Sequence, residues 1–319
     1  METRLEKSTQ LKRVLPKKKK DLCFEDLFEL FKIKGYVRSG YFGNVYSIAF
    51  RNEDNNDYEI VPFKSMKCVR RKPEFLMKVT YDSKESRAEI RILKYIMTNV
   101  IPHTPHVFLY YNHVNCGSVQ FRGKYKRGVA KSSEDWTYVK TGKGLITFME
   151  YAGVTLEQYF KKPSDMNEQF IFLFQLLYTL CVFQKVKLLH YDIYPANVTV
   201  MDTGHTSPKI WKYEVKGKHY YVPVNQRIPV IIDFGQSEMQ KKRLEVLLEN
   251  NNDADMLIEM FRDYTHNMSM RAICSNMLRK INTKDMIRPR YFDYTNILSD
   301  FFKVFTNKPD KKTEVTWKL

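Results

Sequence analysis

Three short segments of the sequence combine glycine, carboxylate and amide residues in patterns that suit phosphate and metal chemistry. The first, residues 37–45, reads Val-Arg-Ser-Gly-Tyr-Phe-Gly-Asn-Val. Gly40 and Gly43 stand between strand-like flanks. Because glycine has no Cβ, a hairpin built on these two residues can bring its backbone close to phosphate groups. Taken alone, the pattern also fits a simple turn.

The second segment, residues 190–197, reads His-Tyr-Asp-Ile-Tyr-Pro-Ala-Asn. Asp192 and Asn197 follow a long apolar run, so a tight loop can bring both side chains to one site. The carboxylate of Asp192 could accept a proton from a hydroxyl group, and the amide oxygen of Asn197 is a hard ligand that suits magnesium. The alternative is a turn in which both side chains satisfy nearby backbone groups.

The third segment, residues 230–235, reads Val-Ile-Ile-Asp-Phe-Gly. A buried strand with this sequence presents the carboxylate of Asp233 at its end, and Gly235 lets the chain turn away. A carboxylate in that position could bind a magnesium ion that bridges phosphate groups. The alternative is an ordinary exit from a strand into a turn.

The first half of the chain is predicted to hold mostly strands and one helix. Residues 45–50 and 75–79 are rich in strand-forming side chains and predict two strands. Apolar residues recur at helical spacing over residues 83–98, which predicts a helix. Residues 117–144 are polar and rich in Gly, Lys and Ser, so they predict a surface insertion.

The second half is predicted to be mainly helical. Residues 170–183 form a nearly unbroken apolar run, which predicts a helix buried on most sides. Helical patterns return after Lys241 and continue to about Thr306, and a hairpin is predicted over residues 211–224. The change of character places a boundary between the two halves near residues 150–153.

The order of the three segments resembles the signature of the protein kinase superfamily, which comprises a glycine-rich loop, a strand lysine, a helix glutamate, H-R-D-x-x-x-x-N and D-F-G. The resemblance covers about residues 30–300. It implies an α+β bilobal kinase fold, with a small antiparallel β-sheet lobe that carries one helix and a larger, mainly helical lobe. The implied organisation is a flexible basic tail (1–23), a small lobe (24–150), a large lobe (151–306) with a hairpin insertion (203–228), and a C-terminal tail (307–319).

The resemblance also implies roles for individual residues. Asp192 is the expected catalytic base, and Asn197 and Asp233 are the expected ligands of Mg²⁺. Lys78 is the expected strand lysine that grips the phosphates of ATP and pairs with the helix residue Glu89, although Lys64 is a rival for that position. The other expected ATP-binding residues belong to the glycine loop and to the connection between the lobes: Val37, Gly40, Gly43, Val45, Glu150 and Ala152.

The sequence departs from the kinase pattern at several positions. Arg38 replaces the first loop glycine, and Tyr194 replaces a lysine that typical Ser/Thr kinases carry two positions after the base. Tyr191 replaces the arginine of H-R-D, so regulation through a phosphate on the activation segment is not expected. No Ala-Pro-Glu follows Asp-Phe-Gly, which predicts a short activation segment. In its inserted hairpin and its short activation segment the chain resembles divergent kinases of large DNA viruses, and residues 149–160 resemble the haspin branch.

Composition sets broad limits on the function. The 319 residues are 43% hydrophobic, which is enough for a sizeable core and excludes a disordered protein. The formal net charge of +17 would attract nucleotides, nucleic acids or acidic protein surfaces. Five cysteines without disulfide or zinc spacing, and no expected signal sequence or membrane span, predict a soluble intracellular protein. For a viral kinase the host cytoplasm or the virion would be the location.

We therefore expect an ATP- and Mg²⁺-dependent kinase, of viral origin, that phosphorylates serine or threonine residues of protein substrates. Three alternatives stay open: a pseudokinase that acts as a scaffold, a kinase of small molecules, and a basic nucleic-acid-binding protein. A scaffold has little need of a complete set of phosphate- and metal-binding residues, and no recognised nucleic-acid-binding module is present. The oligomeric state is not predicted.

Overall fold

The structure is a computed structural model that describes nine ranges of the chain: 31–40, 43–50, 75–124, 137–162, 164–203, 209–240, 243–287, 293–309 and 315–319. The predicted basic tail at 1–23 and the rival lysine Lys64 lie outside these ranges. The chain divides into two compact units. Unit 1 comprises Met1–Ile90 and Leu109–Tyr151, and unit 2 comprises Arg91–Phe108 and Ala152–Leu319. Each unit is described by itself.

Unit 1 is built on a five-stranded antiparallel sheet with the strand order β1-β2-β3-β5-β4. Its strands are β1 (Phe31–Gly40), β2 (Gly43–Phe50), β3 (Phe75–Tyr81), β4 (Tyr110–Lys124) and β5 (Thr137–Glu150). The helix α3 (Lys84–Asn99) begins directly after β3 and continues into unit 2. The strands over 45–50 and 75–79 and the helix over 83–98 are therefore confirmed.

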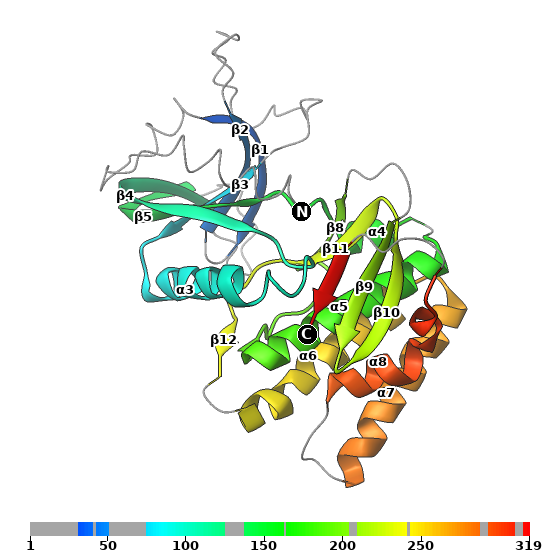
Figure 1. Cartoon of the computed structure of the whole chain (residues 1–319). Helices are drawn as coiled ribbons and strands as arrows, with labels where there is room; N and C mark the ends of the chain where they lie inside the picture. The colour runs from blue at the N-terminus through cyan, green and yellow to red at the C-terminus, as the bar shows by residue number, and fades with distance from the viewer. Residues whose placement is uncertain are drawn as a thin grey trace, which may run out of the picture. The chain divides into compact units, whose positions relative to one another are not determined.

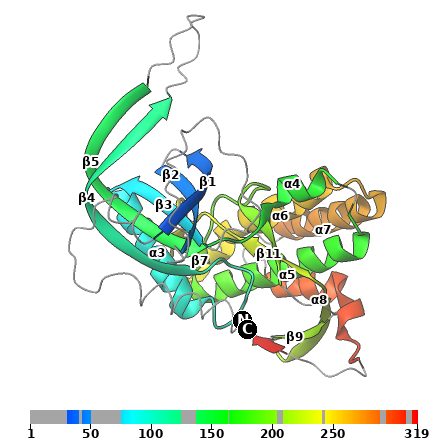
Figure 2. The same ribbon diagram turned by 90° about the horizontal axis from the view of Figure 1, so that it is seen from above.

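The long hairpin of β4 and β5 extends well beyond the other three strands of the sheet (Figure 2). Its outer part pairs residues 119–124 with residues 137–142, beyond a register shift between Cys116 and Val119. These residues belong to the polar stretch 117–144 that we expected to form a surface insertion.

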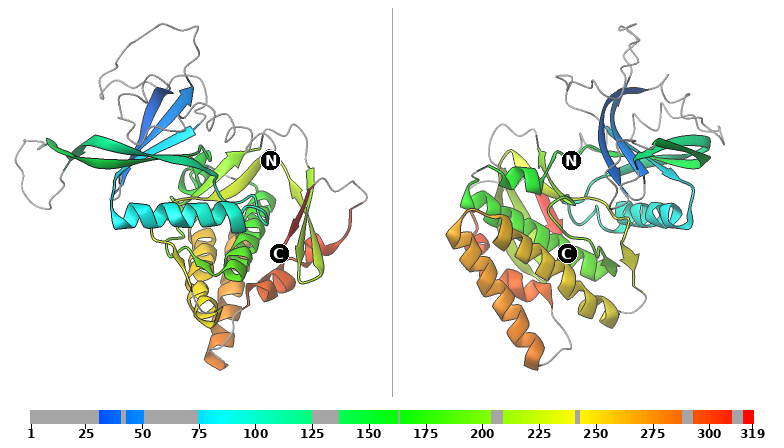
Figure 3. Two further views of the ribbon diagram at one scale, coloured as in Figure 1. Left: turned by 60° about the vertical axis from the view of Figure 1, so that its left-hand side comes forward. Right: turned by 180° about the vertical axis from the view of Figure 1, so that it is seen from behind.

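Unit 2 contains five helices in its described residues, together with the end of α3. They are α4 (Leu156–Phe160), α5 (Met166–Val186), α6 (Arg243–Tyr264), α7 (Met268–Ile287) and α8 (Tyr294–Phe301), followed by a 3₁₀ turn, η1 (Lys303–Thr306). The helices α5, α6 and α7 lie side by side (Figure 3). The predicted return of helices after Lys241 is confirmed.

Three small sheets accompany these helices. One has the order β11-β8-β6, from β11 (Arg227–Ile231), β8 (Val198–Asp202) and β6 (Val154–Thr155). A two-stranded sheet pairs β7 (Leu188–Leu189) with β12 (Glu238–Met239). The third has the order β10-β9-β13, from β10 (Lys218–Val224), β9 (Lys209–Val215) and β13 (Val315–Lys318).

Helix α5 forms the centre of unit 2. Asp165 caps its start by accepting a hydrogen bond from the N–H of Asn167 at 3.2 Å, and Lys187 ends it in a left-handed conformation with φ of 60°. By length and composition α5 could cross a membrane, contrary to our expectation that no segment reaches that length. Most of its side chains are nevertheless buried inside the unit, as they are in the core helix of a globular protein.

The predicted hairpin is present as β9 and β10, and the chain reverses at Gly217, where φ is +77°. We expected residues 307–319 to form a C-terminal tail, and residues 315–318 of that segment form β13. This strand pairs with β9 in parallel and buries Trp317, which contacts Trp211 at a ring-centroid distance of 5.9 Å. Burying an indole provides the driving force that holds the end of the chain in the sheet (Figure 1).

These elements make the chain a mixed α+β protein with several small sheets, mostly antiparallel, and, in its described residues, six helices. The α+β class is therefore confirmed. The finer prediction, a bilobal kinase fold, stays a prediction.

Candidate active site

In unit 1 the predicted strand lysine and helix glutamate are in direct contact. Lys78 Nζ lies 2.6 Å from Glu89 Oε1. Both residues are 8% exposed, so the ion pair is buried. A buried charge requires a partner of opposite sign, and the pair places one fixed ammonium group on the sheet.

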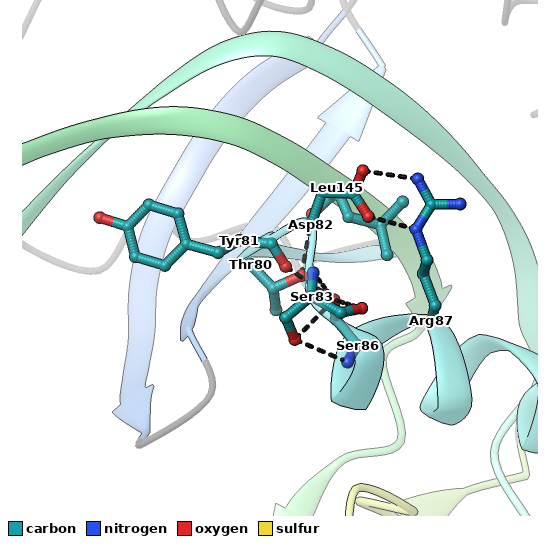
Figure 4. A network of polar contacts seen from close by, with 7 residues as sticks. All are labelled: Thr80, Tyr81, Asp82, Ser83, Ser86, Arg87 and Leu145. Carbon is teal, nitrogen blue, oxygen red and sulfur yellow. Dashed lines mark hydrogen bonds and ion pairs between the residues drawn. The ribbon is translucent and has the colours of Figure 1, made fainter.

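A network of polar contacts fixes the turn between β3 and α3 (Figure 4). Ser83 Oγ accepts from the N–H of Ser86, and Ser86 Oγ accepts from the N–H of Ser83, so each residue caps the other. Asp82 and Arg87 form a two-pronged ion pair with N–O distances of 2.5 and 2.6 Å. The direction of α3 relative to β3 is thus fixed within a few residues of Lys78 and Glu89.

The glycine hairpin runs beside Lys78 in the same sheet. Gly40 pairs with Gly43 at the end of β1 and β2, and Val45 stands directly opposite Lys78 on β3. Gly43 precedes Val45 by two positions, and alternate residues of a strand lie on the same face. Val37 falls at a register shift between Tyr36 and Arg38, so it has no partner residue on β2. Gly43, Val45 and Lys78 therefore mark one face of the sheet.

Glu150 and Ala152, the predicted adenine contacts, are both buried. The N–H of Glu150 donates to the carbonyl of Leu109 at 2.8 Å, and the side chain of Glu150 accepts from the N–H of Leu109 at 3.1 Å. Any adenine contact from Glu150 would therefore come from its carbonyl oxygen rather than its N–H. Glu150 belongs to unit 1 and Ala152 to unit 2.

In unit 2 the loop after α5 brings Asp192 and Asn197 together. Asn197 Nδ2 donates to Asp192 Oδ2 at 2.8 Å and to the Asp192 carbonyl at 3.1 Å. Asn197 is fully buried, and its other amide atom, Oδ1, has no hydrogen-bond partner among the described residues. A buried oxygen without a partner is energetically costly. A hydrogen-bond donor or a cation bound at this atom would remove that cost.

Asp233 is tied to the same loop through the residue that precedes it. The N–H of Ile232 donates to the Asn197 carbonyl at 2.9 Å, and His190 Nε2 bonds the Ile232 carbonyl at 3.0 Å. Asp233 itself has a φ of 62°. A non-glycine residue with positive φ costs on the order of 1–3 kcal/mol, and such strain is typical of functional sites.

His190 is a buried residue that links the backbone of Asp192 to the backbone of Ile232, the residue before Asp233. Its Nδ1 accepts the N–H of Asp192 at 3.3 Å, so Nε2 must carry the proton that the Ile232 carbonyl accepts. Burial lowers the pKa of His190 to about 4, with opposing contributions from the Ile232 carbonyl and Asp233. The imidazole therefore positions Asp192 and the strand end at neutral pH without adding charge.

The carboxylate of Asp253 on α6 accepts hydrogen bonds from the backbone at His190 and Tyr191. Asp253 Oδ2 accepts from the N–H of His190 at 2.9 Å, and Oδ1 accepts from the N–H of Tyr191 at 3.0 Å. Tyr191 has a φ of 62°, which two hydrogen bonds to one carboxylate help to maintain. Burial raises the pKa of Asp253 to about 6, although both backbone donors act in the opposite direction.

Phe234 anchors the Asp-Phe-Gly turn in the core of unit 2. Its ring is fully buried and lies 4.8 Å from the ring of His190 and 5.9 Å from that of Phe183 on α5. Packing of this kind fixes the residue before it, because Asp233 can move only if the ring moves.

The residues fit a magnesium ion that is coordinated by protein oxygens and phosphate oxygens together. Within the described ranges no group of three or more His, Cys, Asp or Glu could hold a metal ion. Magnesium, however, is bound by one or two protein oxygens together with phosphates and water. Asn197 Oδ1 and the Asp233 carboxylate are such oxygens, and the unpartnered state of Oδ1 is the observation that favours them.

The structure thus assembles two groups of the predicted residues and adds residues to which the sequence assigned no role. Unit 1 joins Lys78 to Glu89, and unit 2 joins Asp192 to Asn197 and to the strand end before Asp233. His190 and Asp253 were not predicted. The acidic residue Asp253 stands within the apolar pattern of α6, which marks it as unusual in the sequence. The backbone groups that it binds cannot be found from sequence alone.

We also compared the sequence with known proteins. No model of a known protein family matches the chain, and no curated protein matches it either.

Proposed function

We propose that the chain is an ATP- and Mg²⁺-dependent protein kinase that phosphorylates serine or threonine. The observation that carries the proposal is the loop at 192–197, where one amide binds the Asp192 carboxylate through its nitrogen and keeps a buried oxygen without a partner. Phosphoryl transfer needs this combination, a base for the hydroxyl and a metal ligand beside it.

In this proposal Asp192 orients the substrate hydroxyl and accepts its proton as the new bond to phosphorus forms. Asn197 Oδ1 and Asp233 would hold Mg²⁺, which neutralises phosphate charge when bound. The hydrogen bond between Asn197 and Asp192 then keeps the base and the metal ligand at a fixed separation.

Lys78 is proposed to bind the phosphates of ATP from unit 1. Its ammonium group is fixed by Glu89 rather than free to rotate in water, so less entropy is lost when a phosphate binds. Gly43 and Val45 mark the same face of the sheet, and the absence of a Cβ at Gly43 allows close approach of phosphate oxygens.

The test is transfer of label from [γ-³²P]ATP to a generic acidic or basic protein with magnesium, followed by phosphoamino-acid analysis. We expect label on serine or threonine, and loss of label in the Asn197→Ala variant but not in Asn296→Ala, a control at an exposed asparagine of α8. Label on tyrosine would overturn the specificity. Label on no protein, with ATP still bound, would replace the proposal by a scaffold or a small-molecule kinase.

A further inference from the structure

Residues 237–240, which follow Asp-Phe-Gly, are attached to the loop before Asp192. The strands β7 and β12 pair Leu188 with Met239 and Leu189 with Glu238. The N–H of Gln240 donates to the Lys187 carbonyl at 2.9 Å, which extends the pairing by one residue. Helix α6 begins at Arg243, so the connection is short.

Two side chains complete this attachment. Gln240 Nε2 donates to the hydroxyl oxygen of Tyr191 at 3.2 Å. Ser237 Oγ donates to the His190 carbonyl at 3.3 Å. Tyr191 is 37% exposed, and its backbone N–H is bonded to Asp253. Its hydroxyl group therefore offers Gln240 an acceptor at a defined position. All of these contacts are between neutral groups.

The sequence leaves little room for control of this segment by phosphate. From Phe234 to Lys242, Ser237 is the only residue with a hydroxyl group. Its Oγ is a donor to His190, whereas a phosphate oxygen is an acceptor that carries negative charge. A phosphate on Ser237 would lose the bond to the carbonyl and place a second acceptor against it. Phosphorylation would therefore loosen the attachment rather than create it.

We propose that Tyr191 and Gln240 are positioning residues, which hold the segment after Asp-Phe-Gly in its working arrangement by a neutral hydrogen bond, without any phosphate. The inference rests on the proposed kinase function for its activity measurements. The position of Asp233 depends on both ends of its turn, since β11 holds the residues before it and the β7–β12 pair holds the residues after it. Loss of the Tyr191–Gln240 contact weakens the attachment of the second end and leaves the first end unchanged.

The first experiment compares Tyr191→Phe, Gln240→Ala and the double variant with a matched control, Tyr264→Phe, whose ring is 45% exposed. We expect each single change to lower kcat by about three- to ten-fold, as for loss of one hydrogen bond, with the KM for ATP unchanged. The double variant should lose no more than either single variant, because both remove the same contact. Additive losses, or an effect of Tyr264→Phe of the same size, would overturn the inference.

The second experiment addresses phosphate directly. The purified protein is treated with a phosphatase, and its mass is measured to establish that no phosphate remains. We expect full activity, and we expect Ser237→Ala to keep most of it while Ser237→Asp is less active. A loss of activity on dephosphorylation, or an active Ser237→Asp beside an inactive Ser237→Ala, would refute the proposal.

Hydrogen exchange separates failure of this inference from failure of the proposed function. The amides of Met239 and Gln240 should exchange several-fold faster in Tyr191→Phe than in the parent chain, whether or not the protein has kinase activity. Unchanged exchange would show that Tyr191 does not hold the segment. An absence of kinase activity with faster exchange would refute the kinase and leave the attachment in place.

Discussion

Replacing Lys78 and Glu89 together distinguishes a phosphate-binding lysine from a structural ion pair. The pair is buried, with 8% exposure on both sides and a separation of 2.6 Å. Lys78→Met leaves the Glu89 carboxylate buried without its cation, and Glu89→Leu leaves the ammonium group in the same state. A variant with both changes has neither buried charge.

The expected magnitudes follow from this geometry. Breaking a buried pair by removal of one partner costs about 3–5 kcal/mol, whereas replacing both partners by apolar side chains of similar volume is often neutral. The two single variants should therefore be clearly destabilised, and the double variant should unfold at nearly the parent free energy. Since a positioned charge on a transferring phosphate is worth roughly 10²–10³ in rate, the double variant should remain at least about 100-fold less active.

The assay combines chemical unfolding with phosphate transfer for the parent, both single variants and the double variant. Lys84→Met serves as the control, because Lys84 is an exposed lysine at the start of the same helix. If the double variant recovers activity together with stability, Lys78 is structural and its assignment to ATP is wrong. If the single variants are as stable as the parent, the pair is not the buried pair that the structure shows.

Three further predictions concern unit 2. Asp253→Asn should lower the free energy of unfolding at neutral pH by about 1–3 kcal/mol, because an amide nitrogen then faces a backbone N–H. Burial raises the pKa of Asp253 to about 6 from an ordinary 3.8, so this carboxyl adds stability that is fully present below pH 3.8 and is lost as the pH rises through 6. The free energy of unfolding of the parent should therefore fall between pH 4 and pH 7, and the variant should lack this dependence on pH. The same pH dependence in both proteins would contradict the assignment. Gly153→Ala should lower the free energy of unfolding by at least about 2 kcal/mol or prevent folding, because φ is +90° and the new Cβ would lie 2.1 Å from the Val200 carbonyl oxygen. A variant as stable as the parent in a denaturant titration would show that Gly153 does not adopt this conformation. Lys187→Gly should raise the free energy of unfolding by about 1 kcal/mol, since the left-handed end of α5 suits glycine, and a lower midpoint in the same titration would refute this.

Much of the fold could be predicted because the relevant signals are local. The apolar run at 170–183 became the buried helix α5, and the helical spacing over 83–98 became α3. The C-terminal strand was missed because Trp317 is buried by Trp211, a residue more than one hundred positions away. No local pattern in the last five residues reports such a partner.

The candidate site shows the same division between local and distant contacts. Asp192 and Asn197 could be paired from sequence, because five positions in a tight loop determine their contact. The choice of Lys78 over Lys64 depended on the strand pattern, and the structure shows Lys78 beside Glu89. The support from Asp253 depends on how α6 packs beneath the loop, which a single sequence does not reveal.

The most direct test of the kinase proposal is a single-turnover measurement of phosphate transfer by the parent chain and by Asp192→Asn, with binding of Mg-ATP measured on the same samples. We predict that the variant binds Mg-ATP about as well as the parent and transfers phosphate at least about 100-fold more slowly, since it has lost only the proton acceptor. Equal transfer rates in the two proteins would contradict the role of Asp192, and no transfer by the parent to any protein would contradict the kinase.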